Sequence, residues 1–164
     1  MYKRLELHNH TNESDAVFTC KELTDFMVAD QVDAFALTDH NTISGHCKIK
    51  NYLKEHPQPI DFIPGMEYTT YYGHILCLNL TEYVPWENIN RHKPELLFRA
   101  ARKKGALVGV AHPYSFGWPF AQGCRFEMTI TDYSCCDFIE IFNNPEPLHE
   151  VNEKGVKLWE NLVL

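Results

Sequence analysis

Two histidines lie two residues apart near the start of the chain, and an acidic residue follows them closely. His8 and His10 belong to the segment LHNHTNESDA, which also contains Asp15. Side chains at positions i and i+2 of a strand point to the same face, so both imidazoles can bind one ion. Imidazoles combined with carboxylates suit Zn²⁺, Mn²⁺ or Fe²⁺ better than Ca²⁺ or Mg²⁺. Taken alone, however, such a pair is more often a surface feature, so a metal site requires further ligands.

Further residues of ligand type follow other apolar runs of the sequence. Each lies at or just past the expected C-terminal end of a different strand: Asp39 and His40, Glu67, His112, and Glu140 with Asn143. In parallel α/β sheets and β/α barrels, the loops at this end of the strands build the active site. We therefore expect these side chains to converge.

Several of these residues have a second interpretation. Asp39 either binds a metal or orients a neighbouring histidine ligand through a hydrogen bond. His40 precedes Asn41 and Thr42 and could instead belong to a helix cap. His74, after Gly73, is either a ligand or a hairpin surface residue. Glu140 and Asn143 suit a position at the rim of the site or hydrogen bonds that stabilise the fold.

Two residues favour the site more strongly. Glu67 follows Pro64–Gly65, where an acidic residue has no packing reason to end a buried strand. His112 ends the apolar run ALVGVA, where an imidazole needs a partner. The other histidines lie in helical, charged stretches and are expected on the surface: His46, His56, His92 and His149.

The elements that must position these residues alternate along the chain. Strands are expected at 2–7, 33–40, 60–70, 71–80, 106–113 and 136–144, and helices at 19–31, 42–56, 93–105 and 149–164. The strand at 60–70 is expected to be interrupted at Pro64–Gly65, and it could form a hairpin with 71–80. Thr19 with Glu22 predicts one helix start, while Pro94 and Gly105 bracket another helix. This alternation predicts an α/β fold around a mainly parallel sheet.

The composition limits the class of protein. A chain of 164 residues with 45% apolar residues predicts one globular domain over 1–164. A net charge of −7 argues against general nucleic-acid binding. We find no run of 18 apolar residues and no secretion signal, which predicts a cytoplasmic protein without membrane contact. The six cysteines include no CxxC pair and are expected to be reduced; a redox or metal role for Cys124 or Cys135–Cys136 is the lesser alternative.

These motifs together resemble the polymerase and histidinol phosphatase (PHP) domain family of metal-dependent phosphoesterases. The matching pieces are HNHTNESD, ALTDHNTISG, PGMEYTT followed by GH, and AHP, in that order, within residues 5 to about 143. GMEYTTYYGH and EIFNN look most like the carbaryl-hydrolase-like branch of the family. The resemblance implies a distorted (β/α)7 barrel that holds two or three Zn, Mn or Fe ions at the C-terminal ends of its strands.

The resemblance also implies roles for individual residues. His8 and His10 would bind one metal, Glu67 would bridge it to another, Asp15 and His40 would bind a further ion, and His74 and His112 would complete the ion shared with Glu67. A metal-bridging hydroxide would then attack phosphorus. The candidate catalytic residues are Glu67, His112 and Asp39.

The sequence departs from the family pattern at its end. The late Asp-x-His strand of the family is missing from these 164 residues, so the barrel is expected to be C-terminally incomplete. Three explanations stay open: a fragment of a longer chain, which we favour, a shortened variant with reduced metal occupancy, or a neighbouring chain that supplies the missing ligands. The expected substrate is a small phosphorylated or nucleotide-like molecule, with Arg125 as the candidate cation that contacts it. Two alternatives stay open: a metal-dependent amide, carbamate or ester hydrolase, and a non-catalytic module stabilised by metal.

Overall fold

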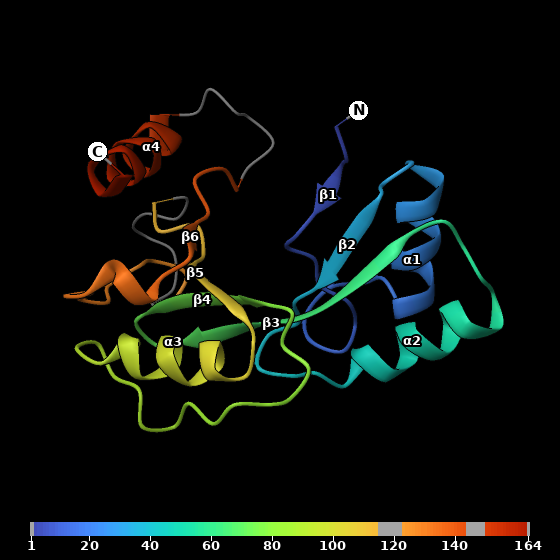
Figure 1. Ribbon diagram of the computed structural model, residues 1–164, viewed down its shortest axis with the longest axis horizontal. Helices are drawn as coiled ribbons and strands as arrows, with labels where there is room; N and C mark the ends of the chain where they lie inside the picture. Colours follow the sequence, from blue (N-terminus) through green and yellow to red (C-terminus); the bar gives the residue numbers. More distant parts are fainter. Residues whose placement is uncertain (1, 115–122, 144–149, 164) are drawn as a thin grey trace. The chain divides into compact units, whose positions relative to one another are not determined.

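Strands and helices alternate along the chain and form a mixed α/β fold, as the sequence predicted (Figure 1). The computed structural model describes residues 2–114, 123–143 and 150–163. Within these ranges the strands are β1 (Leu5–Glu6), β2 (Ala34–Leu37), β3 (Asp61–Thr70), β4 (Gly73–Leu78), β5 (Leu107–Val110) and β6 (Phe138–Ile139). The helices are α1 (Cys20–Ala29), α2 (Gly45–Glu55), α3 (Pro94–Lys103) and α4 (Glu150–Val163), with a short 3₁₀ helix, η1, at Tyr133–Cys135.

The strands are hydrogen bonded in sequence order, from β1 to β6. The pairs β1–β2, β2–β3 and β5–β6 are parallel. Only two residues, Tyr71 and Tyr72, separate β3 from β4. Because so short a connection joins antiparallel neighbours, β3 and β4 form the hairpin that the sequence suggested.

The chain divides into two compact units. The first comprises Met1–Glu67 with Cys77–Tyr83, and the second comprises Tyr68–Leu76 with Val84–Leu164. In the first unit, apolar side chains of α1, β2 and α2 form one core: Cys20, Leu23, Met27, Val32, Phe35, Leu37, Ile49 and Ile60. In the second unit, α3 and β5 bury Leu97, Phe98, Ala101, Val108 and Val110.

The helix ends follow the expected local signals. Thr19 accepts a hydrogen bond from the Glu22 backbone, and the Glu22 carboxylate accepts one from the Thr19 N–H, which makes a complete capping box at the start of α1. Pro94 begins α3, where its missing N–H costs no helical bond. Gly105 follows the end of α3 with φ +84°, a conformation that favours glycine.

The expected interruption of the third strand is wrong, because β3 runs through Pro64 and Gly65 without a break. The Pro64 carbonyl accepts a hydrogen bond from Leu80 N at 2.8 Å. A Cβ on Gly65 would lie 2.7 Å from the Cys77 carbonyl oxygen, so glycine permits a close approach of two backbones here. The Gly65 N–H lies 3.2 Å from His46 Nε2, so a side chain of α2 contacts the strand backbone at this point.

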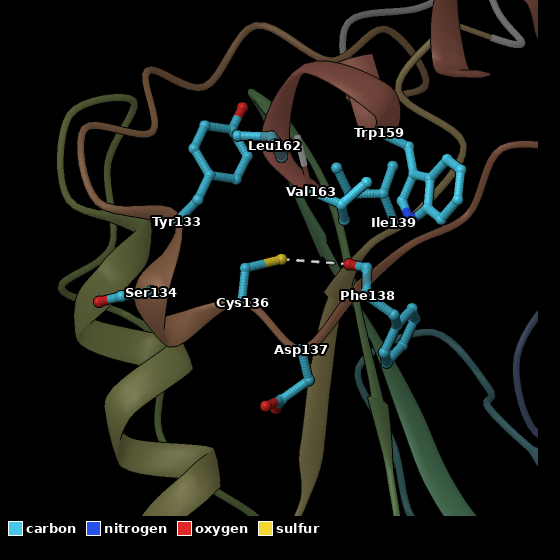
Figure 2. Close-up of a pocket in the computed structure, with 9 residues that line it drawn as sticks. All are labelled: Tyr133, Ser134, Cys136, Asp137, Phe138, Ile139, Trp159, Leu162 and Val163. Carbon is cyan, nitrogen blue, oxygen red and sulfur yellow. Dashed lines mark hydrogen bonds between the residues drawn. The ribbon is translucent and has the colours of Figure 1, made fainter. Parts of the chain in front are cut away.

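The end of α4 borders an apolar cavity of about 270 Å³ in the second unit (Figure 2). Trp159, Leu162 and Val163 line one side of it and remain partly exposed. Across the cavity, Cys136 Sγ lies 3.1 Å from the Phe138 carbonyl oxygen, and burial raises the pKa of this thiol. None of the six cysteines, all of which lie in the described part of the chain, forms a disulfide. Among the described residues, no helix has the length and apolar character needed to cross a membrane.

Candidate metal centre

The loop after β1 is fixed to the end of β2 through the residue between the two histidines. The Asn9 backbone N–H donates to Thr38 Oγ1 at 3.0 Å, and Thr38 N donates back to the Asn9 carbonyl at 2.9 Å. The Asn9 side-chain amide also donates to the carbonyls of Glu6 and Ala36. These bonds hold the backbone of residues 8–10 in place, so the imidazoles of His8 and His10 are attached to a fixed backbone.

Glu67 is the residue on which the histidines of the first unit converge. Its side chain is 1% exposed. Its Oε2 atom lies 3.0 Å from His8 Nε2, 3.2 Å from His10 Nε2 and 3.1 Å from His40 Nδ1. The backbone of Glu67 is also fixed, since its N–H donates to the Thr38 carbonyl and its carbonyl accepts from Asn41 N. Three imidazoles from two loops thus surround one buried carboxylate oxygen.

The expectation that Glu67 ends its strand is wrong, because this residue lies inside β3. β3 continues to Thr70 as part of the hairpin with β4, whereas β2 already ends at Leu37. An isolated parallel bridge joins His40 to Glu67. Glu67 is therefore level with the residues that follow β2, which explains why it meets the histidines of the two loops.

A second group of ligand atoms shares members with the first. His10, Asp15 and His40 offer ligand atoms within 4.8 Å of one another. The rings of His10 and His40 stack with centroids 4.4 Å apart. His40 Nε2 lies 3.4 Å from Asp15 Oδ2, while its Nδ1 faces Glu67. One imidazole therefore contacts both carboxylates, and Asp15 is the exposed member, with 67% of its side chain accessible.

The first group fits a divalent transition metal. Ligand atoms about 2.0–2.1 Å from one ion lie roughly 2.9 Å apart at right angles and roughly 3.3 Å apart in a tetrahedron. The contacts of Glu67 Oε2 with His8 and His10, 3.0 and 3.2 Å, fall in this interval. The nitrogen and oxygen donors are those preferred by Zn²⁺, Mn²⁺ and Fe²⁺.

Both carboxylate oxygens of Asp39 accept hydrogen bonds from the loop that carries His10 and Asp15. Its Oδ1 accepts from Thr11 N at 2.6 Å and from Ser14 Oγ at 2.6 Å, and its Oδ2 accepts from Thr11 Oγ1 at 2.7 Å. The residue is 1% exposed. Of the two interpretations of Asp39, these contacts favour a role in orienting the ligand loop. Thr11 and Ser14 were not identified from the sequence, because short polar residues in a turn carry no signal that separates them from ordinary surface residues.

The second unit brings together the later candidates. The rings of His74 and His112 lie with centroids 5.2 Å apart, and both residues are buried. The backbone N–H of His112, at φ +29°, donates to Glu140 Oε2 at 3.0 Å, and Asn143 Nδ2 donates to Glu140 Oε1 at 3.1 Å. Glu140 and Asn143 therefore hold the backbone at His112. Arg125, half-buried, pairs with Glu127 at 3.3 Å.

The expectation that His46 is a surface residue is wrong. His46 is 6% exposed, and its Nε2 lies 2.7 Å from the Gly65 carbonyl oxygen. Desolvation lowers the pKa of this imidazole, so the neutral form is favoured. The sequence favoured an exposed position because His46 lies between polar residues of the helical pattern. In the structure, however, its side chain points inward and contacts β3. His56 and His92 are exposed as expected, and His149 lies outside the described residues.

The chain is similar to proteins of known family. The PHP domain model matches residues 6–113, which is more than half of the chain. An uncharacterized protein of Methanocaldococcus jannaschii, MJ1587, is 28% identical over 151 residues, covering 85% of this chain and 81% of that protein. The 5'-3' exoribonuclease Rnm of Escherichia coli is 30% identical over 116 residues, and the match spans 64% of this chain but 40% of that enzyme.

A solved structure supports the fold over nearly the whole chain. It is a two-domain protein of Bacteroides vulgatus, described as containing a predicted PHP-like metal-dependent phosphoesterase. The superposition has a TM-score of 0.74 at 21% identity and covers 99% of this chain and 49% of that structure. Similarity at this level of identity establishes the fold. The order of the ligand motifs, the α/β architecture and the match of the family model agree, and the chain belongs to the PHP domain family.

Proposed function

We propose that this protein is a metal-dependent phosphoesterase that hydrolyses a phosphomonoester or phosphodiester. The observation that carries the proposal is the convergence of His8, His10 and His40 on one oxygen of the buried Glu67, at 3.0 to 3.2 Å. The name of the Escherichia coli relative, an exoribonuclease, and the description of the Bacteroides vulgatus structure support the same reaction class.

The residues of the first unit would hold two ions. His8, His10 and Glu67 are the proposed ligands of one ion, and Asp15 and His40 are those of the other. Divalent transition metals would supply Lewis-acid stabilisation of the phosphoryl oxygens and activation of water. Glu67 would keep neighbouring ligands together, because its oxygen faces three imidazoles.

Other residues take supporting positions in the proposal. Asp39 would orient the loop with His10 and Asp15 through its bonds to Thr11 and Ser14. His74 and His112 are proposed metal ligands of the second unit, and Arg125 is the proposed cationic contact for a phosphate.

Turnover assays test the reaction class. The metal-free protein would be supplied with Mn²⁺, Zn²⁺ or Fe²⁺ and given an aryl phosphomonoester, an aryl phosphodiester, an aryl carboxylic ester and an aryl carbamate. Turnover of a phosphate ester, with much slower reaction of the carbon esters, is expected. Absence of phosphate-ester turnover while metal is demonstrably bound would refute the proposal, and preferential turnover of the ester or carbamate would support the alternative hydrolase.

A charge-neutral substitution tests the central ligand. Glu67→Gln keeps the shape of the side chain but removes the negative charge that faces three imidazoles. We expect at least one equivalent of bound metal and nearly all activity to be lost, as measured by elemental analysis and by the phosphate-ester assay. Glu87→Gln is the matched control, because Glu87 is exposed. If Glu67→Gln binds as much metal as Glu87→Gln, the assignment of Glu67 is wrong.

A further inference from the structure

The loop that carries Asp15 is a compact turn with its own internal bonds. Ser14 N and Ala16 N both donate to the Thr11 carbonyl at 3.1 Å, and Asn12 N donates to the Phe18 carbonyl at 2.8 Å. Asp15 itself is largely exposed. Its carboxylate lies 3.4 Å from Ser14 Oγ and 3.4 Å from His40 Nε2, both long for strong bonds, so the position of this carboxylate depends on how the loop is anchored.

One anchor comes from a helix that contributes no ligand. Glu13, two residues before Asp15, points its carboxylate at the first turns of α2. Ser44 Oγ donates to Glu13 Oε2 at 2.6 Å, and Lys48 Nζ forms an ion pair with Glu13 Oε1. The Glu13 side chain is 13% exposed, compared with 56% for Lys48, so the carboxylate is substantially shielded by its partners.

The anchor continues into the turn before α2. Thr42 Oγ1 donates to Ser44 Oγ at 3.0 Å, and Ser44 N donates to Thr42 Oγ1 at 3.1 Å. The Ser44 hydroxyl is therefore held in a position to meet Glu13. Together, Glu13, Ser44 and Lys48 form what we call the α2 clamp.

The ligands of the other proposed ion are fixed differently. His8 and His10 depend on the bonds between Asn9 and Thr38, and Glu67 depends on its place in β3. None of these bonds involves α2 residues of the clamp. A change in the clamp should therefore affect Asp15 more than Glu67.

We propose that the α2 clamp positions Asp15 and thereby sets the affinity of the ion held by Asp15 and His40, without setting that of the ion held by His8, His10 and Glu67. This inference rests on the metal ligands of the proposed function. Without the clamp, the loop samples other conformations, and metal binding must order it again. Loss of a partner that orients a ligand typically lowers metal affinity by roughly 10–100-fold.

Calorimetric titration of the metal-free full chain with Mn²⁺ tests the proposal. The variant Asp15→Asn identifies which of the Mn²⁺-binding events in the titration belongs to the ion bound by Asp15. Lys48→Met is expected to raise the Kd of that same event roughly tenfold and to leave the Glu67-dependent event unchanged. Lys54→Met on the last turn of α2 is the control, since Lys54 is exposed on the same helix. Lys48→Arg, which restores the ion pair, should return the Kd to near the wild-type value.

The outcomes separate this proposal from the proposed function. If Lys48→Met behaves like Lys54→Met in every event, or weakens both events equally, the clamp does not position Asp15 and the inference is wrong while the metal site stands. If the wild-type chain binds no Mn²⁺, Zn²⁺ or Fe²⁺, both the clamp proposal and the proposed function are refuted. Circular dichroism of each variant confirms that the fold is retained.

Discussion

At the scale of single residues, the histidines and carboxylates were predictable but their partners were not. His8, His10, Asp15, His40 and Glu67 were identified from residue type and spacing, and the first unit brings them together. The sequence left Asp39 with two interpretations, because residue type alone does not show which groups a carboxylate meets after folding. Its three bonds to Thr11 and Ser14 are tertiary contacts across 25 to 28 residues of chain.

These contacts lead to a prediction for Asp39→Asn. Both carboxylate oxygens of Asp39 accept hydrogen bonds, and asparagine replaces one of them with an NH₂ group. This group cannot accept from the donors of Thr11 or Ser14, so at least one buried hydrogen bond is lost. We expect the free energy of unfolding of the metal-free protein to fall by about 1–3 kcal/mol, together with weaker metal binding. Urea denaturation and metal titration measure the two effects. Asp61→Asn, at an exposed strand start, is the control, and equal behaviour of the two variants would contradict the orienting role.

At the scale of elements, local sequence signals were enough to predict the helices, whereas the continuity of the strands depended on tertiary packing. The capping box of α1, the proline of α3 and the order of the elements were all readable from sequence. The continuity of β3 through Pro64–Gly65 was not, because it depends on a close backbone approach to Cys77 and on His46 from α2. For the same reason the inward orientation of His46 escaped prediction.

The buried His46 leads to a prediction about pH. Burial lowers its folded-state pKa below the ordinary value of 6.5, so the unfolded chain binds more protons at mildly acidic pH. Its contribution to stability is complete above pH 6.5 and declines as the pH falls through the folded-state pKa. The free energy of unfolding, measured without metal, should therefore decrease as the pH is lowered below 6.5 in the wild type. The decrease should be smaller in His46→Gln.

The matched control for this pH series is His56→Gln, which changes an exposed histidine at the end of the same helix. It should keep the pH dependence of the wild type. Identical slopes for His46→Gln and the wild type would show that His46 does not contribute the proposed proton linkage.

At the scale of the whole molecule, the family and the fold class were predictable from the order of the motifs, and the family match confirms them. The division into two compact units was not predicted, because β3 and β4 each contribute residues to both units and the sequence shows no linker. In the first unit the proposed ligands come from the loop after β1, the residues after β2, and β3. An ion bound there would join segments that are distant in sequence.

Such cross-linking predicts that metal removal lowers thermal stability. A ligand at 100 times its Kd that binds only the folded state stabilises by about 2.7 kcal/mol, which corresponds to a Tm increase of roughly 5–10 °C for a chain of this size. Differential scanning calorimetry of the metal-free protein with and without Mn²⁺ or Zn²⁺ measures the increase. Glu67→Gln should show a smaller increase, and an unchanged wild-type Tm at saturating metal would show that no ion links these segments.

The metal centre at Glu67 is tested most directly by anomalous X-ray scattering from a crystal grown with Mn²⁺ or Zn²⁺, recorded on both sides of the metal absorption edge. We expect a peak about 2.0–2.2 Å from His8 Nε2, His10 Nε2 and Glu67 Oε2, and a second peak beside Asp15 and His40. A crystal whose anomalous map shows no peak at Glu67, with the three imidazoles still around its carboxylate, would contradict the metal centre on which the proposed function rests.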